Sequence, residues 1–274
     1  MKRMFIAVLV AIAVSGASAF AADRNLPISN LHVEKFIPLA ELSQHQEVRV
    51  IRVVDPLAIY SNVTGFSGMA FAQGASSGGI TRMVMDDLTF TTNPGVSAVT
   101  TIRFSVANLN ATTQSVRARV RFWNADGASL GAGLANAPGT YYSPGGTPVG
   151  FSFNAFSFPP GVTTLSGNLG AGFTVPAGTT TTLWAGQTFD NVGTTTGATD
   201  TELSNFGQAM FNPVDLGSST NTLFETTAAG SFFPTNNPAG AALAFGGSPV
   251  ANDGWEFVVT TLPVGLTDFS VDSK

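Results

Sequence analysis

The chain has 274 residues, no cysteine and a formal net charge of −5, and charged residues make up only 11% of it. The lack of cysteine excludes disulfide cross-links, so stability must come from packing and hydrogen bonds. The acidic balance argues against nucleic acid and anionic membranes as partners, because both are bound mainly through an excess of Lys and Arg.

The first residues predict a signal peptide over positions 1–21. Lys2 and Arg3 precede an apolar run from Phe5 to Val14, and Ala19-Phe20-Ala21 has the small-x-small form of a cleavage site. A membrane span needs about 18 or more unbroken apolar residues, which this run does not reach. We therefore expect a secreted protein, extracellular, at the cell surface or periplasmic, without a transmembrane segment.

Residues 22–46 form a lead-in segment that contains the only two histidines, His32 and His45. From residue 47 to residue 262, short alternating runs are separated by Gly, Pro, Asn and Asp clusters. This pattern predicts one all-β domain, an antiparallel β-sandwich or jelly roll, and residues 263–274 form a C-terminal tail. The expected strands are 47–54, 88–91, 99–108, 114–124, 149–158, 180–189, 208–212, 241–245 and 255–260.

The clearest alternation lies in the strand expected at 114–124. Its apolar face is Val116, Ala118, Val120 and Phe122, and its other face is Arg117, Arg119, Arg121 and Trp123. The polar connector 109–113 predicts a hairpin with the strand 99–108, which would add Arg103 to the arginine face. Such a face is suited to an anionic glycan, although carboxylates of a neighbouring strand or solvent would also satisfy it.

Five short motifs occur in the order found in a group of secreted bacterial β-sandwich proteins. They are Ile59–Asn62, Met85–Phe90, Val120–Gly127, Thr182–Trp184 and Gly254–Phe257. Over residues 57–260 the chain resembles these exported proteins, which often carry C-terminal sorting signals of the Pro-Glu-Pro type. The usual anchor, an apolar stretch followed by basic residues, is missing here, and Leu262–Phe269 looks like the sequence that often precedes such a tail. The resemblance implies a β-sandwich and export, and it transfers no catalytic residue.

Residues with catalytic potential are few, and we expect no enzyme. A Ser-His-Asp triad would have to use His32 or His45, both upstream of the expected sandwich. A hydrolase would need two carboxylates facing each other across a cleft, which a sequence cannot reveal. The candidates by residue type are Asp86, Asp87, Asp126, Asp190, Asp253 and Glu256.

We expect no cofactor, with calcium as the one alternative. Extracellular calcium sites take oxygen ligands from loops, and Asp86 and Asp87 are the ligands that we expect. Asn252-Asp253-Gly254 reads as an ordinary turn sequence. Trp123, Tyr141 and Tyr142 are the aromatic residues expected to be exposed for stacking on sugars, whereas Trp184 and Trp255 are expected in the core.

These observations together favour a non-enzymatic extracellular or cell-surface protein with a matrix, biofilm or adhesion role. Glycans, matrix components or further copies of the chain are the partners expected. The first alternative is a carbohydrate-binding module that uses the aromatic residues and the arginine face, with or without calcium. The second is an extracellular hydrolase. A self-associating protein should present an unprotected sheet edge or an apolar patch.

Overall fold

The computed structural model describes residues 24–26, 31–42, 54–74, 76–90, 97–175, 181–191, 197–230, 235–244 and 252–260. The described residues do not include the signal peptide expected at 1–21, His45, most of the strand expected at 47–54 or the tail expected at 263–274. No helix among the described residues is long and apolar enough to cross a membrane.

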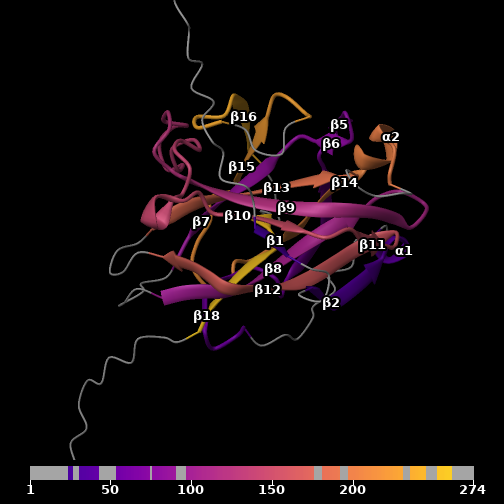
Figure 1. Cartoon of the computed structure of the whole chain (residues 1–274), viewed down its shortest axis with the longest axis horizontal. Helices are drawn as coiled ribbons and strands as arrows, with labels where there is room; N and C mark the ends of the chain where they lie inside the picture. Colours follow the sequence, from indigo (N-terminus) through magenta and orange to yellow (C-terminus); the bar gives the residue numbers. More distant parts are fainter. Residues whose placement is uncertain are drawn as a thin grey trace, which may run out of the picture.

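Two sheets packed against each other form a β-sandwich, as the sequence predicts (Figure 1). Sheet A has the order β1-β10-β9-β13-β7-β15-β16, with β11 beside β9 and the pair β5-β6 beside β13. Its pairings are antiparallel, except that β1 is parallel to β10. The strands are β1 (Arg24–Leu26), β10 (Gly150–Phe153), β9 (Gln114–Asn124), β13 (Thr182–Asp190), β7 (Val84–Thr89), β15 (Thr222–Thr226), β16 (Gly240–Ala244), β11 (Phe156–Phe158), β5 (Ser76–Ser77) and β6 (Ile80–Thr81).

Sheet B is built around β8 and β12, which pair along most of their length. β2 pairs with the far side of β12, and β14 and β18 share the other side of β8, followed outward by β4 and β3. The strands are β8 (Ser97–Asn108), β12 (Gly161–Val175), β2 (Leu31–Pro38), β14 (Phe206–Phe211), β17 (Asn252–Asp253), β18 (Trp255–Val259), β3 (Ala58–Ser61) and β4 (Phe66–Ala72).

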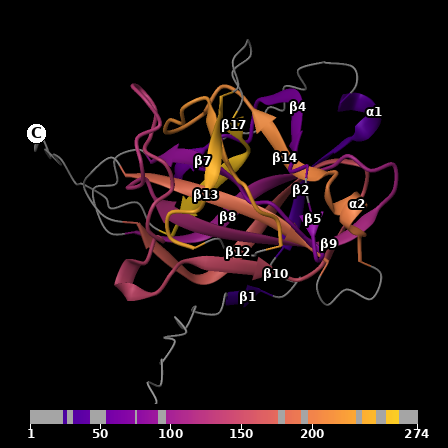
Figure 2. The same cartoon turned by 90° about the horizontal axis from the view of Figure 1, so that it is seen from above.

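Among the described residues, helical structure is confined to single turns. They are α1 (Leu39–Leu42), α2 (Asp200–Leu203) and a 3₁₀ turn at Pro144–Gly146. α2 lies beside β5 at one end of the sandwich (Figure 2). A capping box fixes its first turn, since the Thr199 side chain accepts from the Glu202 N–H and the Glu202 carboxylate accepts from the Thr199 N–H.

The main core fills the space between the sheets with aliphatic and aromatic side chains. Ile102, Phe104 and Val106 of β8 and the apolar face of β9 belong to the same buried cluster, together with Trp255 and Phe257. The alternation in β9 therefore has the orientation that the sequence predicts, with the arginines on the outer side of sheet A.

The predicted hairpin between β8 and β9 is wrong. The two strands belong to different sheets, and the connector 109–113 crosses from one sheet to the other. Asn108 holds this crossing, because its side-chain amide donates to the carbonyls of Thr112 and Phe158. A connection between two sheets and a hairpin within one sheet give the same alternation in each strand. The local pattern therefore does not distinguish them.

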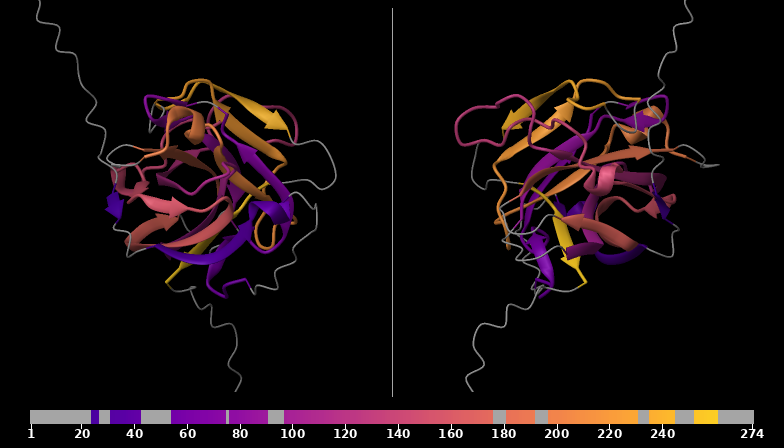
Figure 3. Two further views of the ribbon diagram at one scale, coloured as in Figure 1. Left: turned by 90° about the vertical axis from the view of Figure 1, so that its right-hand side faces the viewer. Right: turned by 60° about the vertical axis from the view of Figure 1, so that its left-hand side comes forward.

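The lead-in segment contributes strands to both sheets. β1 pairs with β10, and β2 pairs with β12 at the edge of sheet B. His32 lies on β2 with an exposed side chain. In sheet A, β15 and β16 lie at the end opposite to β1 and are drawn in orange and yellow in Figure 3.

Candidate functional site

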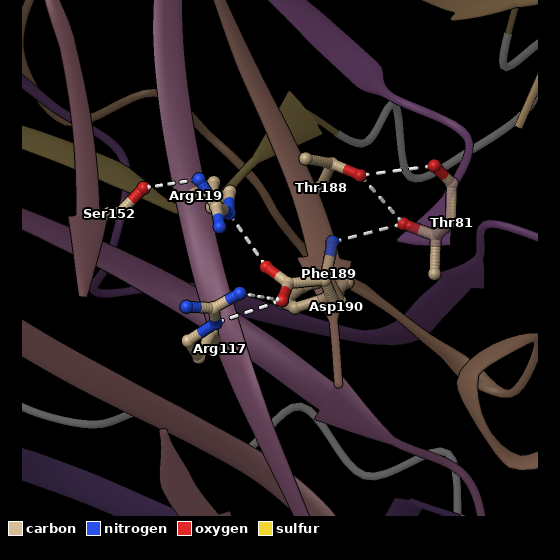
Figure 4. Close-up of polar contacts among 7 residues, drawn as sticks. All are labelled: Thr81, Arg117, Arg119, Ser152, Thr188, Phe189 and Asp190. Carbon is tan, nitrogen blue, oxygen red and sulfur yellow. Dashed lines mark hydrogen bonds and ion pairs between the residues drawn. The ribbon is translucent and has the colours of Figure 1, made fainter. Parts of the chain in front are cut away.

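The polar cluster on the outer face of sheet A is built from two arginines and one carboxylate (Figure 4). Arg117 faces Asp190 across the β9–β13 pairing, and its Nε donates to Asp190 Oδ1 at 2.8 Å. Arg119 Nε donates to Asp190 Oδ2 at 2.7 Å, and its Nη1 donates to the Ser152 hydroxyl at 2.8 Å. Asp190 is fully buried, and its carboxylate accepts hydrogen bonds from both guanidiniums.

The remaining arginines occupy different surroundings. Arg121 lies two residues after Arg119 on the same face of β9 and is 2% exposed. Its guanidinium lies 4.8 Å from the centre of the Tyr141 ring. Arg103 was expected to join this face, and that expectation is wrong because β8 belongs to sheet B. There Arg103 pairs with Glu34, Asp55 and Glu256.

Most of the aromatic residues expected at the surface are buried. Trp123 has no exposed surface and packs with Trp184, Met83 and Phe224 in a second cluster on the outer side of sheet A. The segment around Asn136 covers this cluster, and the Asn136 carbonyl accepts a 2.7 Å hydrogen bond from Trp184 Nε1.

Tyr142 is 5% exposed and donates to the Thr174 carbonyl at 2.6 Å, while burial raises its pKa to about 12. Tyr141 is half-buried, and it is more exposed than Trp123 or Tyr142. The expectation of exposure is therefore wrong for Trp123 and Tyr142. Trp184 and Trp255 are in the core, as predicted.

The two neighbouring carboxylates expected to bind calcium point to opposite faces of β7. Asp86 faces the core, where it is level with Ala185 and Leu223 of the adjacent strands. Its carboxylate accepts from the Ser219 hydroxyl at 2.8 Å and from the Asp253 N–H at 2.9 Å. Asp87 faces the outer side and accepts from the Thr220 hydroxyl at 2.9 Å. The Ser219 hydroxyl also lies 3.4 Å from Asp87 Oδ1, so one hydroxyl approaches both carboxylates.

Asp253 is the neighbour of Asp86 that sequence reasoning missed. It lies on β17 of sheet B, opposite Met210, whose side chain belongs to the inner cluster that contacts sheet A. Asp86 and Asp253 are 0% and 1% exposed, so each sheet contributes one carboxyl group to the same buried region. The Asn252-Asp253-Gly254 sequence reads as a turn, and nothing local indicates that Asp253 faces the core.

The surroundings raise the pKa of all three carboxyl groups. Burial and then the Asp253 charge raise the pKa of Asp86, against the opposing hydrogen bond from Ser219. Burial raises the pKa of Asp87 to about 6 and also raises that of Asp253. The Trp255 indole lies close enough to favour ionised Asp253, yet its N–H makes no hydrogen bond of good geometry with that carboxylate.

The other candidate acids are held by local partners. The exposed Asp126 accepts from the N–H and hydroxyl of Thr140, at 2.7 and 2.6 Å. Glu256 is buried against Arg103. Within the described residues, no three Asp, Glu, His or Cys side chains form a group that could hold a metal ion.

An open groove with a volume of about 410 Å³ lies between the 3₁₀ turn and β12. Pro144, Pro148, Ala171 and Phe173 line it, and none of its lining residues is charged. None of the six candidate carboxylates lies in this groove. Comparisons with family models, with curated proteins and with solved structures give no match.

Proposed function

We propose that this chain is a secreted, non-enzymatic structural protein of an extracellular matrix or cell surface that associates with further copies of itself. The observation that carries the proposal is the edge strand β16, which pairs with β15 on one side. No described strand pairs with its other side. Its sequence, Gly240-Ala-Ala-Leu-Ala244, has no charge and no proline, and four of its five residues are exposed.

The edge of sheet B that β2 forms has the features that prevent strand addition. β2 carries Glu34 and Lys35 and ends in Pro38, and natural edge strands use such residues to discourage pairing. β16 has none of these features, so its free N–H and C=O groups remain available to another strand. The contrast between the two edges supports β16 as the edge through which the protein associates.

A second copy of the same chain is the partner that fits this edge. Antiparallel pairing of two β16 strands centred on Ala242 would place Ala241 opposite Leu243 of the other copy and Gly240 opposite Ala244. Small side chains permit this approach, and such a two-fold contact is self-complementary. Each copy is acidic, with a formal net charge of −5 for the full sequence, and an uncharged strand keeps repulsion at the contact low.

A cysteine at position 242 tests the pairing directly, because the natural chain contains no other cysteine. Facing residues of an antiparallel pair have Cα atoms about 4.5–5.5 Å apart, which suits a disulfide. Ala242→Cys should therefore form covalent dimers under mild oxidation. Val33→Cys, on the 51% exposed site of β2, is the matched control and should stay monomeric.

The matrix role is tested by Ala242→Lys in the cells that secrete the protein. The variant should lose self-association in sedimentation and be released from the matrix fraction, whereas Val33→Lys should behave like the natural chain. Equal cross-linking of both cysteine variants would contradict pairing through β16. Retention of a monomeric Ala242→Lys variant in the matrix would contradict a role based on self-association.

Carbohydrate binding is the second candidate, and one observation favours it. Arg117 and Arg119, with side-chain exposures of 20% and 11%, place positive charge beside the Asp190 carboxylate on the outer face of sheet A. A sulfated or carboxylated glycan would complement that charge. Binding to acidic glycans that is lost in Arg117→Gln would support this function, and equal binding by both proteins would contradict it.

A further inference from the structure

The buried meeting point of Asp86 and Asp253 lies where the two sheets approach each other. The Asp253 N–H donates to the Asp86 carboxylate, which fixes the two residues side by side although β7 and β17 belong to different sheets. Leu223 and Met210, one on each sheet, pack next to the two residues and close the region on its apolar side. Solvent therefore does not reach either carboxylate.

Several oxygen atoms in this region have no hydrogen-bond partner. Both carboxylate oxygens of Asp253 accept no hydrogen bond, and neither does the amide oxygen of Asn62. The Asn62 amide nitrogen donates to the Asp253 carbonyl at 3.1 Å and to the Phe211 carbonyl at 3.3 Å, which anchors the Asn62 side chain beside the Asp253 backbone. Asn62 is fully buried, and its carbonyl-type oxygen is a neutral ligand of the kind found in cation sites.

Tyr60 adds a third unpartnered group. Its side chain is fully buried, its hydroxyl has no hydrogen-bond partner, and it lies within electrostatic reach of Asp86 and Asp253. No described Arg, Lys or His forms an ion pair with either aspartate. An ionised carboxylate buried without a partner costs several kcal/mol, so this arrangement calls for a positive charge that the described side chains do not supply.

We propose that Asp86, Asp253 and Asn62 bind a calcium ion that joins the two sheets. Two carboxylates balance the charge of a divalent ion, and the amide oxygen of Asn62 supplies a neutral ligand. Calcium accepts oxygen ligands in irregular geometry, whereas magnesium demands an octahedral shell and retains most of its water. The chemistry of the ligands and the dry surroundings therefore favour calcium over magnesium. Asp87 is left out of this set of ligands, because its carboxylate already accepts from the hydroxyl and the N–H of Thr220.

Two of the three ligands are carboxylates, and they come from different sheets. The site forms only when the sheets pack together, so calcium binds the folded chain in preference to the unfolded chain. Such linkage raises the unfolding temperature by an amount that grows with the calcium concentration.

The test is thermal unfolding of the protein refolded from denaturant near neutral pH, with chelator, with calcium and with magnesium. Refolding in the presence of each ion is needed because the site is closed to solvent. At calcium concentrations about 100-fold above Kd, the unfolding temperature should rise by about 5–10 °C relative to chelator. Magnesium should give a much smaller rise. Terbium refolded into the site should emit when Trp255 is excited, because Trp255 lies beside Asp253.

Asp253→Asn and Asp86→Asn keep the side-chain shape and should each remove the calcium response and the terbium emission. Asp126→Asn, which changes an exposed carboxylate, should keep both. The proposal is overturned if calcium leaves the unfolding temperature of the natural chain unchanged. It is also overturned if the calcium response persists in both core variants. Stabilisation by acid without any response to calcium would mean that a shared proton occupies the place assigned to the ion.

Discussion

The two outer faces of the sandwich hold ion-pair clusters of opposite composition. On sheet A, two guanidiniums bracket the single carboxylate of Asp190, and on sheet B three carboxylates surround the single guanidinium of Arg103. Removing one carboxylate therefore has different consequences on the two faces. On sheet A it removes the carboxylate that pairs with both guanidiniums, and on sheet B it leaves a cation that still has two partners.

Asp190→Asn should have the largest effect. The substitution keeps the side-chain shape but removes the charge that Arg117 and Arg119 share, and both arginines are mostly buried. Breaking a buried pair in this way costs about 3–5 kcal/mol, and we expect the lower end because the arginines retain some exposure. Urea unfolding measures the loss. Asp126→Asn is the exposed control and should change the free energy of unfolding by about 0.5 kcal/mol or less.

Glu256→Gln tests the other face and should cost less. Glu256 is fully buried against Arg103, but Glu34 and Asp55 remain to neutralise the guanidinium. We expect a loss of about 1–2 kcal/mol in the same urea experiment. A loss equal to that of Asp190→Asn would contradict this comparison. The number of carboxylates per arginine would then not determine the loss of stability.

Tyr142→Phe measures the cost of losing a neutral hydrogen bond, for comparison with the two charged clusters. Loss of the bond to the Thr174 carbonyl should cost about 1 kcal/mol near neutral pH. Burial raises the pKa of Tyr142 to about 12, so the folded chain resists ionisation that the unfolded chain undergoes near pH 10. Stability should therefore fall as pH rises from about 10 to 12, and less so in Tyr142→Phe. An identical alkaline loss in both proteins would contradict this assignment.

The sequence predicts the strands whose side chains alternate cleanly, and it fails where glycine interrupts the alternation. β9 has the predicted bounds Gln114–Asn124 and the predicted inner face. β12 is the longest strand and was not predicted, because its four glycines resemble a loop. Gly170 and Gly172 have φ values of 64° and 68° at an irregularity in the pairing with β8. A Cβ at Gly167 would lie 2.7 Å from the Phe153 ring.

The candidate sites were predicted only in part, because partners across the sandwich are invisible in a linear pattern. The arginine face of β9 follows from period-two alternation, but its counter-ion Asp190 lies 71 residues from Arg119 in the chain. Asp86 was chosen as a metal ligand together with its sequence neighbour Asp87, although adjacent residues of a strand point to opposite faces. Its partner across the core, Asp253, is 167 residues away.

Asp253→Asn in chelator should have the smallest effect and gives the sharpest contrast with Asp190→Asn. Both aspartates are fully buried, but Asp190 has two arginines whereas Asp253 has no cationic partner among the described residues. Without a bound cation, removing the Asp253 charge relieves repulsion with Asp86. The free energy of unfolding should therefore change by less than about 1 kcal/mol or increase. A loss as large as that of Asp190→Asn would mean that a favourable partner already satisfies Asp253, and the case for a cation between the sheets would fail.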